Sequence, residues 1–383
     1  MTNHLTKSAE LEGKILSKFE WVTLQLAEPK YTASPFDKEV RGMKSKLTVI
    51  VPAYNEVDSI VDTVRSIQGQ TLPPDEIIVV DDGSTDGTGD AARKCGVTVI
   101  RPPVNTGSKA GAQNFALTQV KTEFTMAIDA DTMLAPDAIE LLMASLSVPS
   151  VVAACGFVLP RFVKTLWERG RYIEYLLAFS WYKPIQDFYQ KPLISSGCFS
   201  AYRTEVLRSV GGWNTRTMAE DMDLTWTFYQ KGHDVRFIPK ALCYPIEPHN
   251  FHFMSKQLKR WSHGFIQNVS LHWRANLHIP YLREIVAVAL WDAIVASLVY
   301  LIVIPVLAIV FKEPLFVLAY LIDLPAIVVP VLFTAEGRRH PLRVLASLPA
   351  FFVLRAVNGY FIVKAIWDEW IMQRRLNVYE KGH

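Results

Sequence analysis

A nearly uncharged stretch close to the C-terminus constrains this chain more than any other feature. Between Glu284 and Ala335 only five of 52 positions carry a charge, whereas 20% of all 383 residues are charged. Two apolar runs inside it, 285–311 and 314–333, are long enough to cross a bilayer at about 1.5 Å per residue. Half of the chain is hydrophobic, which excludes a disordered or collagen-like protein. We therefore expect a globular protein joined to a membrane segment.

The charges around the apolar runs predict their orientation. The connection at Lys312–Glu313 is short and neutral, whereas residues 338–343 contain three arginines and a histidine. Basic connections are expected on the cytoplasmic side. A third apolar run, 342–371, is interrupted by five charged residues. It could span the bilayer and place the C-terminus outside, or lie in the interface and keep Arg374 and Arg375 inside. The sequence leaves both possibilities open.

The remaining composition narrows the class of protein. A net charge of +3, without a Lys/Arg run or a zinc-ligand spacing, gives no reason to expect nucleic acid as a partner. Four scattered cysteines are expected to be free thiols in a reducing cytoplasm. The N-terminus lacks an apolar signal sequence, which predicts a cytoplasmic start. The polar leader contains one amphipathic stretch that could lie on a membrane surface or pack against the next domain, with Ile15, Phe19, Val22 and Leu26 at helical spacing.

From Lys46 onward, short apolar runs alternate with helical patterns. We expect strands at 47–52, 76–82, 97–100, 124–129, 151–160 and 194–202. Helical patterns are expected at 55–70, 86–95, 108–120 and 167–181, with a further helix beginning near Glu220. Unbroken apolar strands are typical of a mainly parallel sheet covered on both faces. Such sheets bind ligands beyond the carboxyl ends of their strands.

Acidic pairs follow two of these expected strands. Asp82, in VVDDGSTDGT, can accept hydrogen bonds from a base or ribose, although DDG is also a common turn. Asp129 and Asp131 stand two residues apart, where both can face one divalent cation. Carboxylate oxygens suit Mg²⁺ or Mn²⁺, and two buried like charges are costly without a cation. The sequence therefore predicts a nucleotide and metal site at this edge.

Three further motifs each allow a functional and a structural interpretation. Asn105–Lys109 opens a helix with free amides and an ammonium, which can bind an anion or simply be solvated. Glu220–Asp221 begins a helix, where acidic residues are favoured in any case. Gln257, Arg260 and Trp261 share one helix face. Arginine suits phosphate and tryptophan can stack on a sugar, but such a belt is also typical of a membrane-interface helix.

Taken together and in this order, DDGSTD, DAD, an ED preceded by GGWNT, and QLKRW closely resemble the family 2 glycosyltransferases. The resemblance is to the membrane-embedded branch with D, DxD, TED and QxxRW motifs, which includes cellulose, chitin, hyaluronan and poly-N-acetylglucosamine synthases. It implies an α/β fold: a GT-A (Rossmann-like) domain with amphipathic interface helices and a C-terminal transmembrane helical segment. The implied boundaries are a leader at 1–45, a catalytic domain at 46–250, interface helices at 251–283, a transmembrane segment at 284–373 and a tail at 374–383.

The resemblance also implies roles for single residues. Asp221 and Glu220 would be catalytic, with Asp221 as the general base, and Asp129 and Asp131 would hold Mg²⁺ or Mn²⁺. The acceptor would contact Gly197, Cys198 and Trp261. The donor, a UDP-sugar, would be bound by Pro52, Tyr54, Glu56, Asp82, Lys109, Asp129, Gln257 and Arg260.

The implied reaction is an inverting, metal-dependent transfer from UDP-GlcNAc or UDP-glucose to the non-reducing end of a β-linked glycan at the cell membrane. The alternatives are transfer to a membrane lipid (a ceramide, a diacylglycerol or a polyprenyl phosphate) and a catalytically silent membrane subunit. Two departures matter. The family's TED reads Ala219-Glu220-Asp221, and no spans are expected before the catalytic domain. Polymer export would then require association of copies, a partner subunit, or a product that is short or stays on a lipid.

Overall fold

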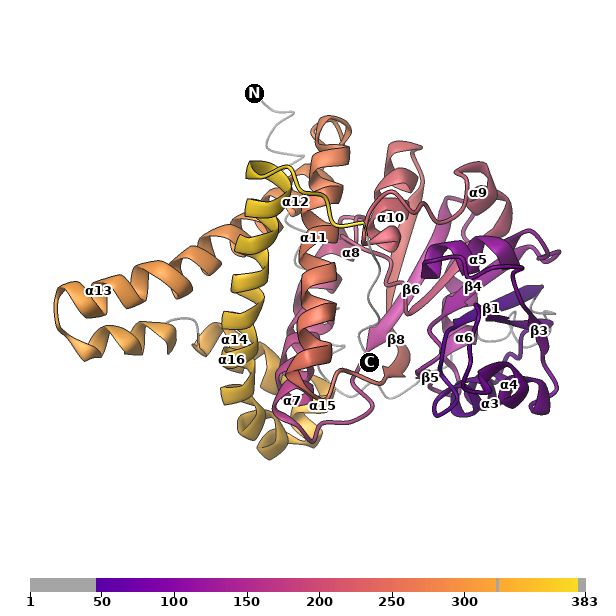
Figure 1. The fold of residues 1–383 in the computed structure, drawn as a ribbon, viewed down its shortest axis with the longest axis horizontal. Helices are drawn as coiled ribbons and strands as arrows, with labels where there is room; N and C mark the ends of the chain where they lie inside the picture. Colours follow the sequence, from indigo (N-terminus) through magenta and orange to yellow (C-terminus); the bar gives the residue numbers. More distant parts are fainter. Residues whose placement is uncertain (1–45, 322–323, 378–383) are drawn as a thin grey trace, which may run out of the picture.

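The computed structural model describes residues 46–321 and 324–377. One mixed sheet lies in the N-terminal part with helices on both faces, and long helices stand beside it toward the C-terminus (Figure 1). Two separate apolar clusters pack on the sheet. The leader 1–45, with its expected amphipathic helix, lies outside the described residues.

The described sheet has eight strands in the order β3-β2-β1-β4-β7-β6-β8-β5. They are β1 Leu47–Ala53, β2 Glu76–Asp81, β3 Thr98–Ile100, β4 Phe124–Ile128, β5 Thr132–Leu134, β6 Val151–Val158, β7 Phe199–Arg203 and β8 Asp234–Pro245. The first four in spatial order are parallel to one another, but β7 runs antiparallel to β4 and β6, and β5 runs antiparallel to β8. The expected parallel arrangement is therefore confirmed for the first half, whereas the second half is mixed, with β6 and β8 parallel to each other. A central strand buried on both faces is apolar in either direction, so composition does not reveal its direction.

Three strands differ from the predicted pattern. The strand expected at 194–202 begins only at Phe199, because Gly197 and Cys198 form a turn. β8 was not predicted, since Arg236, Pro239 and Lys240 interrupt its apolar residues. The short β5, directly after Asp131, was also missed.

The helices of the sheet domain are α3 Ile60–Gln68, α4 Thr88–Lys94, α5 Lys109–Leu117, α6 Ala138–Leu146, α7 Leu166–Leu177, α8 Lys183–Phe188, α9 Thr204–Ser209, α10 Glu220–Gln230 and α11 Phe251–Asn276. The C-terminal helices are α12 Leu282–Trp291, α13 Ile304–Val310, α14 Leu324–Phe333, α15 Ala335–Arg339 and α16 Pro341–Ile366. Short π- or 3₁₀-helical pieces join them: η1 Ala178–Tyr182, η2 Asp292–Ala296, η3 Val299–Val303, η4 Pro314–Leu321 and η5 Trp367–Ile371.

Three of the described helical segments are long and apolar enough to cross a membrane: Leu282–Val310, Pro314–Phe333 and Pro341–Ile371. They correspond to the three apolar runs found in the sequence. The first two form a hairpin whose α13 and η4 part projects away from the sheet domain, whereas α14 at its end packs against α7, and α16 stands beside α7 and α11 (Figure 1). The candidate spans thus differ in their relation to the rest of the molecule.

Candidate active site

The sequence motifs meet at the carboxyl edge of β2, β1 and β4, which are neighbours in the sheet. In the strand register Ala53, the last residue of β1, is paired with Asp81. Asp129 directly follows β4. Parallel strands end at one edge, so Tyr54, Asp82 and Asp129 reach the same side of the sheet.

At the β2 end, Asp82 organises the loop that leads into α5. Its two carboxylate oxygens accept hydrogen bonds from the backbone N–H and the hydroxyl of Thr106, each at 2.8 Å. Asp82 is buried. At the β1 end, Pro52 is half-buried, Tyr54 is exposed, and the Glu56 carboxylate accepts a hydrogen bond from Ser59 at 2.9 Å. The segment after β1 is joined to the segment after β2, because Asn55 N and Glu56 N donate to the hydroxyls of Ser84 and Thr88 at 3.0 and 2.7 Å.

Lys109 connects the DAD motif to the Gly197-Cys198 turn. It is the first residue of α5, whose N-cap Ser108 accepts a hydrogen bond from Gly111 N. The Lys109 ammonium forms an ion pair with Asp129 and donates to the Gly197 carbonyl at 3.0 Å. Burial acts to lower the pKa of Lys109, but nearby carboxylates outweigh it and raise the pKa above its usual range. A permanent positive charge therefore lies at the centre of the site.

Asp221 lies on the other side of the same turn. Its Oδ2 accepts a hydrogen bond from Gly197 N at 2.8 Å, and its Oδ1 accepts one from Met222 N at 2.9 Å. A Cβ at position 197 would lie 2.8 Å from Asp221 Oδ2, so a side chain there would displace the carboxylate. Asp221 is half-buried in the first turn of α10, where the helix favours an anion.

Glu220 precedes Asp221 in the first turn of α10. Burial and the negative charge of Asp221 raise its pKa, while Lys109 and Arg260 act to lower it. These interactions bring Arg260, from α11, into the electrostatic environment of Glu220. Site residues from α5, α10 and α11 are thereby joined around the Gly197 turn.

The DAD carboxylates have the donor chemistry of a site for a hard divalent cation. Asp129 is one-third exposed, and Asp131 is buried with Oδ1 accepting from the Thr132 hydroxyl at 3.1 Å. Among the described residues no group of three or more His, Cys, Asp or Glu side chains is placed to hold a metal ion. Two carboxylates fit Mg²⁺ or Mn²⁺ where diphosphate oxygens complete the coordination.

The QxxRW residues are arranged around a buried arginine that was not predicted. Arg171 of α7 is fully buried, and its Nη2 donates to Gln257 Oε1 at 2.6 Å. Its guanidinium lies 4.5 Å from the centroid of the Trp261 ring, and its Nε lies 3.4 Å from Glu247 Oε2. Arg171 could have been noticed as a charge within an amphipathic helix, but no sequence spacing links it to Glu247 or Gln257.

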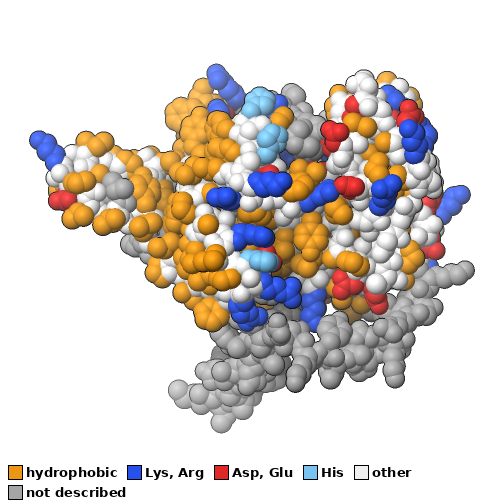
Figure 2. All heavy atoms as spheres, turned by 90° about the horizontal axis from the view of Figure 1, so that it is seen from below, with side chains coloured by type: hydrophobic (Ala, Val, Ile, Leu, Met, Phe, Trp, Pro, Cys, Tyr) orange, Lys and Arg blue, Asp and Glu red, His pale blue; other side chains and the backbone are white. Residues whose placement is uncertain are grey.

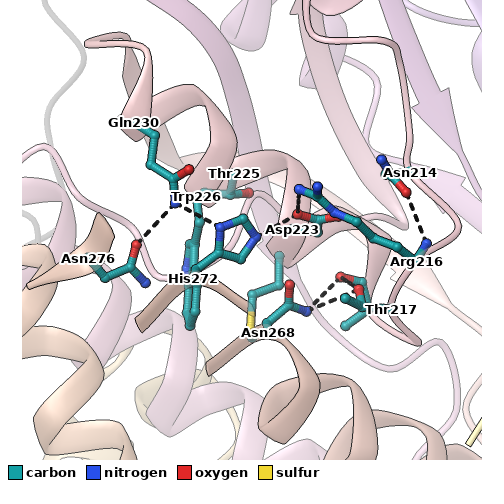
Figure 3. Close-up of polar contacts among 12 residues, drawn as sticks. Asn214, Arg216, Thr217, Asp223, Thr225, Trp226, Gln230, Asn268, His272 and Asn276 are labelled. Carbon is teal, nitrogen blue, oxygen red and sulfur yellow. Dashed lines mark hydrogen bonds and ion pairs between the residues drawn. The ribbon is translucent and has the colours of Figure 1, made fainter. Parts of the chain in front are cut away.

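A second unpredicted cluster joins α10 to α11 (Figure 3). Asp223 is 1% exposed and accepts from Arg216 Nε and Nη2 at 2.8 and 2.7 Å, and His272 Nε2 lies 2.6 Å from its Oδ1. Gln230 Nε2 lies 2.7 Å from His272 Nδ1. Burial acts to raise the pKa of Asp223, but hydrogen bonds from His272 and Arg216 dominate and lower it. This cluster fixes the helix that carries Asp221.

The structure thus brings together Lys109, Asp129, Gly197, Glu220 and Asp221, with Arg260 nearby. Gln257 and Trp261 lie around Arg171 instead. The Cys198 carbonyl accepts a hydrogen bond from Asp129 N at 3.2 Å. All four cysteines are free thiols, as predicted.

Residues 48–211 match the model of the family described as glycosyl transferase family 2. A solved mannosyltransferase from Pyrobaculum calidifontis, in complex with GDP-Man and Mn²⁺, aligns with a TM-score of 0.56 and 21% identity. The alignment covers 94% of this chain and 97% of the other, so the fold is shared over nearly the whole length. The fold is therefore the GT-A fold, and residues 48–211 are similar to a family 2 glycosyltransferase domain.

Curated relatives of this chain are named poly-β-1,6-N-acetyl-D-glucosamine synthase. The relative from Staphylococcus epidermidis RP62A is 27% identical over 244 residues, which are 62% of this chain and 59% of the relative. The relative from Staphylococcus aureus MSSA476 is 27% identical over 223 residues, 57% of this chain and 54% of the relative. The chain spans just over half the length of these relatives.

Proposed function

We propose that the chain transfers a sugar, with inversion, from a UDP-sugar to the non-reducing end of a β-linked glycan at the membrane. One observation carries the proposal: Gly197 N holds the Asp221 carboxylate at 2.8 Å, on the same turn whose carbonyl binds the Lys109 ammonium. The curated relatives favour N-acetylglucosamine as the transferred sugar, and so UDP-GlcNAc ahead of UDP-glucose.

In this reaction Asp221 takes the proton of the acceptor hydroxyl as the hydroxyl oxygen attacks the anomeric carbon. The new glycosidic bond forms while the bond from that carbon to the diphosphate oxygen breaks on the opposite face. Each oxygen of Asp221 accepts one backbone N–H, which fixes its direction and leaves lone pairs for the incoming proton. A carboxylate that is only half-buried can also be reached by the acceptor.

The donor diphosphate requires positive charge on its departing side. Lys109 and Arg260 supply fixed charges, and Asp129 with Asp131 would hold Mg²⁺ or Mn²⁺, which adds positive charge at the diphosphate when bound. Asp82 already binds Thr106. We therefore assign Asp82 to shaping the uridine loop, next to Pro52, Tyr54 and Glu56.

The acceptor would lie between the Gly197-Cys198 turn and Trp261. Arg171 covers one face of the Trp261 ring, which remains 38% exposed. The open part of the ring offers an apolar surface on which a sugar can stack. Gln257 is bound to Arg171, so its contribution to diphosphate binding would include holding that arginine in place.

Detergent-solubilised protein incubated with radiolabelled UDP-GlcNAc, UDP-glucose or GDP-mannose and Mn²⁺ tests the proposal. We expect UDP release and labelled glycan with UDP-GlcNAc, sensitivity of the product to a β-N-acetylglucosaminidase, and loss of transfer in EDTA. Asp221→Asn should abolish transfer and keep UDP binding. Release of nucleotide from none of the donors, or full turnover by Asp221→Asn, would reject the proposal.

A membrane lipid is the second candidate acceptor, and one observation favours it. The helix that carries Gln257 and Trp261 packs against α16, whose other side exposes apolar residues. A lipid-linked hydroxyl could therefore approach along the membrane. Labelled product that extracts into organic solvent and resists glycan hydrolases would replace the glycan acceptor with a lipid, while leaving the donor and base assignments intact.

A location on the cytoplasmic side of the membrane is also part of the proposal. The exposed basic segment 338–343 closely follows Glu336, which accepts a hydrogen bond from Tyr172 of α7 at 3.0 Å, so it begins next to the sheet domain. Basic connections favour the cytoplasm, where nucleotide sugars would be available to the site.

A further inference from the structure

The third candidate span, α16 with η5, is packed differently from the other two. In an apolar stretch of 18 residues of this segment 39% of the residues are buried, whereas 18% and 13% are buried in the corresponding stretches of the two helices of the hairpin. Its neighbours are α7 and α11 (Figure 1). One side of this helix is therefore covered by the sheet domain.

The contact with α7 is close along the middle of α16. A Cβ at Gly170 would lie 2.8 Å from the Ala350 carbonyl and 2.9 Å from Leu354 Cβ, so only glycine permits this approach. Farther along, Asn358 Nδ2 donates to Glu174 Oε1 at 2.9 Å. The two helices are therefore joined by a close backbone approach at Gly170 and by the hydrogen bond between Asn358 and Glu174.

Both ends of α16 are also fixed to the sheet domain. Just before it, Glu336 accepts from the Tyr172 hydroxyl of α7. Just after it, Glu369 Oε1 accepts from Gln267 Nε2 at 2.7 Å and lies 2.8 Å from His263 Nδ1, both on α11. A helix that crossed a hydrocarbon core of about 30 Å would carry one end away from that domain.

The chain that follows η5 returns to the active-site loop. Gln267 Nε2 donates to the Leu376 carbonyl at 2.9 Å, and its Oε1 accepts from Met218 N at 2.9 Å. The Arg375 guanidinium donates to the Arg216 carbonyl. These contacts place the residues after α16 directly against the loop that precedes Glu220 and Asp221.

The direction of α16 also differs from that of the hairpin, which projects away while α16 crosses its base (Figure 1). At the crossing a Cβ on Gly359 would lie 3.2 Å from Ser297 Oγ, and the Arg355 guanidinium lies 4.7 Å from the centroid of the Tyr300 ring. Beyond Tyr300 the hairpin exposes apolar side chains on many sides. If the hairpin enters the bilayer, α16 runs along its surface.

The outer face of α16 is mainly apolar, and Lys364, whose side chain is 41% exposed and is paired with Asp368, lies between Tyr360 and Trp367. Exposed apolar positions recur there at helical spacing and include Leu342, Ala346, Pro349, Val353, Tyr360 and Trp367. Exposed Arg338, Arg339 and Arg343 lie at its start. Figure 2 shows hydrophobic side chains continuing from the hairpin onto the neighbouring helices, with Lys and Arg side chains between them and the sheet domain. Apolar, aromatic and basic residues in this arrangement are typical of helices that lie in the membrane interface.

We infer that α16 is a membrane-surface helix whose outer face rests in the lipid interface, so that it does not cross the bilayer. Lipid is the occupant because the face is continuous with the apolar hairpin and is flanked by arginines that suit anionic headgroups. The residues after α16 then stay on the side of the active site. The proposed membrane attachment consists of one hairpin and one surface helix.

Single cysteines on either side of α16 test this topology. Arg338→Cys and Arg374→Cys, both exposed positions, are made separately in the full chain and reconstituted in sealed phosphatidylcholine/phosphatidylglycerol vesicles. An impermeant maleimide is added from outside, and labelled peptides are identified by mass, with native Cys95 as the marker of the sheet domain. We expect both introduced thiols to label in the same vesicle orientation as Cys95. Labelling of positions 338 and 374 from opposite sides of the membrane would overturn the inference.

A depth measurement gives a second readout. A fluorescent label is placed at Leu342→Cys, Val353→Cys or Trp367→Cys, and quenching by lipids with shallow or deep nitroxides is compared. A surface helix gives similar shallow depths at all three positions, whereas a spanning helix makes position 353 much the deepest. Shielding of all three labels from every lipid, in a chain that sediments as a dimer, would assign the face to a second copy and reject lipid as its occupant.

Discussion

Asp221 and Asp223 stand two residues apart on α10 but belong to regions of opposite character. Asp221 is half-buried, faces the Gly197 turn and is reachable from solvent. Asp223 is 1% exposed and is held by both Arg216 and His272. The first region is an open edge with acceptor capacity left for a substrate, and the second is a closed cluster that joins two helices. Within one helical turn, Asp221 is therefore available for catalysis, whereas Asp223 stabilises the packing of α10 against α11.

The largest expected effect is on transfer by Asp221→Asn. The amide cannot take the acceptor's proton, so kcat should fall about 10³-fold, within the range of lost general-base catalysis. The amide oxygen can still accept one of the two backbone N–H groups, whereas its NH2 group cannot accept the other, so the melting temperature should fall only modestly. UDP release kinetics and thermal unfolding in detergent check both parts. If the variant is both inactive and unfolded, Asp221 has a structural role like that of Asp223, and the comparison between the two residues fails.

Asp223→Asn should give the opposite pattern. Asparagine keeps one acceptor oxygen but removes the negative charge and the second acceptor that Arg216 and His272 face, which should lower the free energy of unfolding by about 2–3 kcal/mol. This is below the value for a fully buried pair, because the Arg216 side chain is 42% exposed. Denaturant unfolding of the sheet domain's tryptophan signal measures it. Protein that remains folded should keep kcat within a few-fold, and wild-type stability would show that the closed cluster contributes little.

Glu369, in η5 after α16, tests whether buried contacts outside the open edge influence catalysis by Asp221. Its carboxylate binds Gln267, which in turn binds Met218 in the loop before Asp221. Glu369→Ala should lower kcat about 10-fold while KM for the donor changes less than twofold, since a displaced base costs rate and not donor affinity. Glu369→Gln keeps the acceptor oxygen and should recover most of the rate. Asp368→Asn, next to it but paired with Lys364, is the matched control.

The sequence predicted the open edge better than the closed cluster for a physical reason. Asp82, Asp129 and Asp221 follow strands or begin a helix, so the periodicity of the elements already brings them to one edge. By contrast, the pairs Arg171–Glu247 and Asp223–His272 form only after α7, α10 and α11 have packed. A charged residue on a helix is equally compatible with solvent and with a buried partner. The direction of β7 and the position of α16 likewise depend on tertiary packing.

The smallest expected effect concerns the pH dependence of stability at the open edge. Burial and Asp221 raise the pKa of Glu220 in the folded protein. The protonated form therefore stabilises the fold at low pH, and that contribution is lost as pH rises from about 4.5 through the raised pKa. Glu220→Gln cannot ionise, so its melting temperature relative to wild type should increase between pH 5 and pH 8. The exposed Glu205→Gln serves as the control and should show a flat difference. A flat difference for Glu220→Gln as well would mean that Lys109 and Arg260 fully offset the cost of burying this carboxylate. The charges of the open edge would then be as well paired as those of the cluster around Asp223.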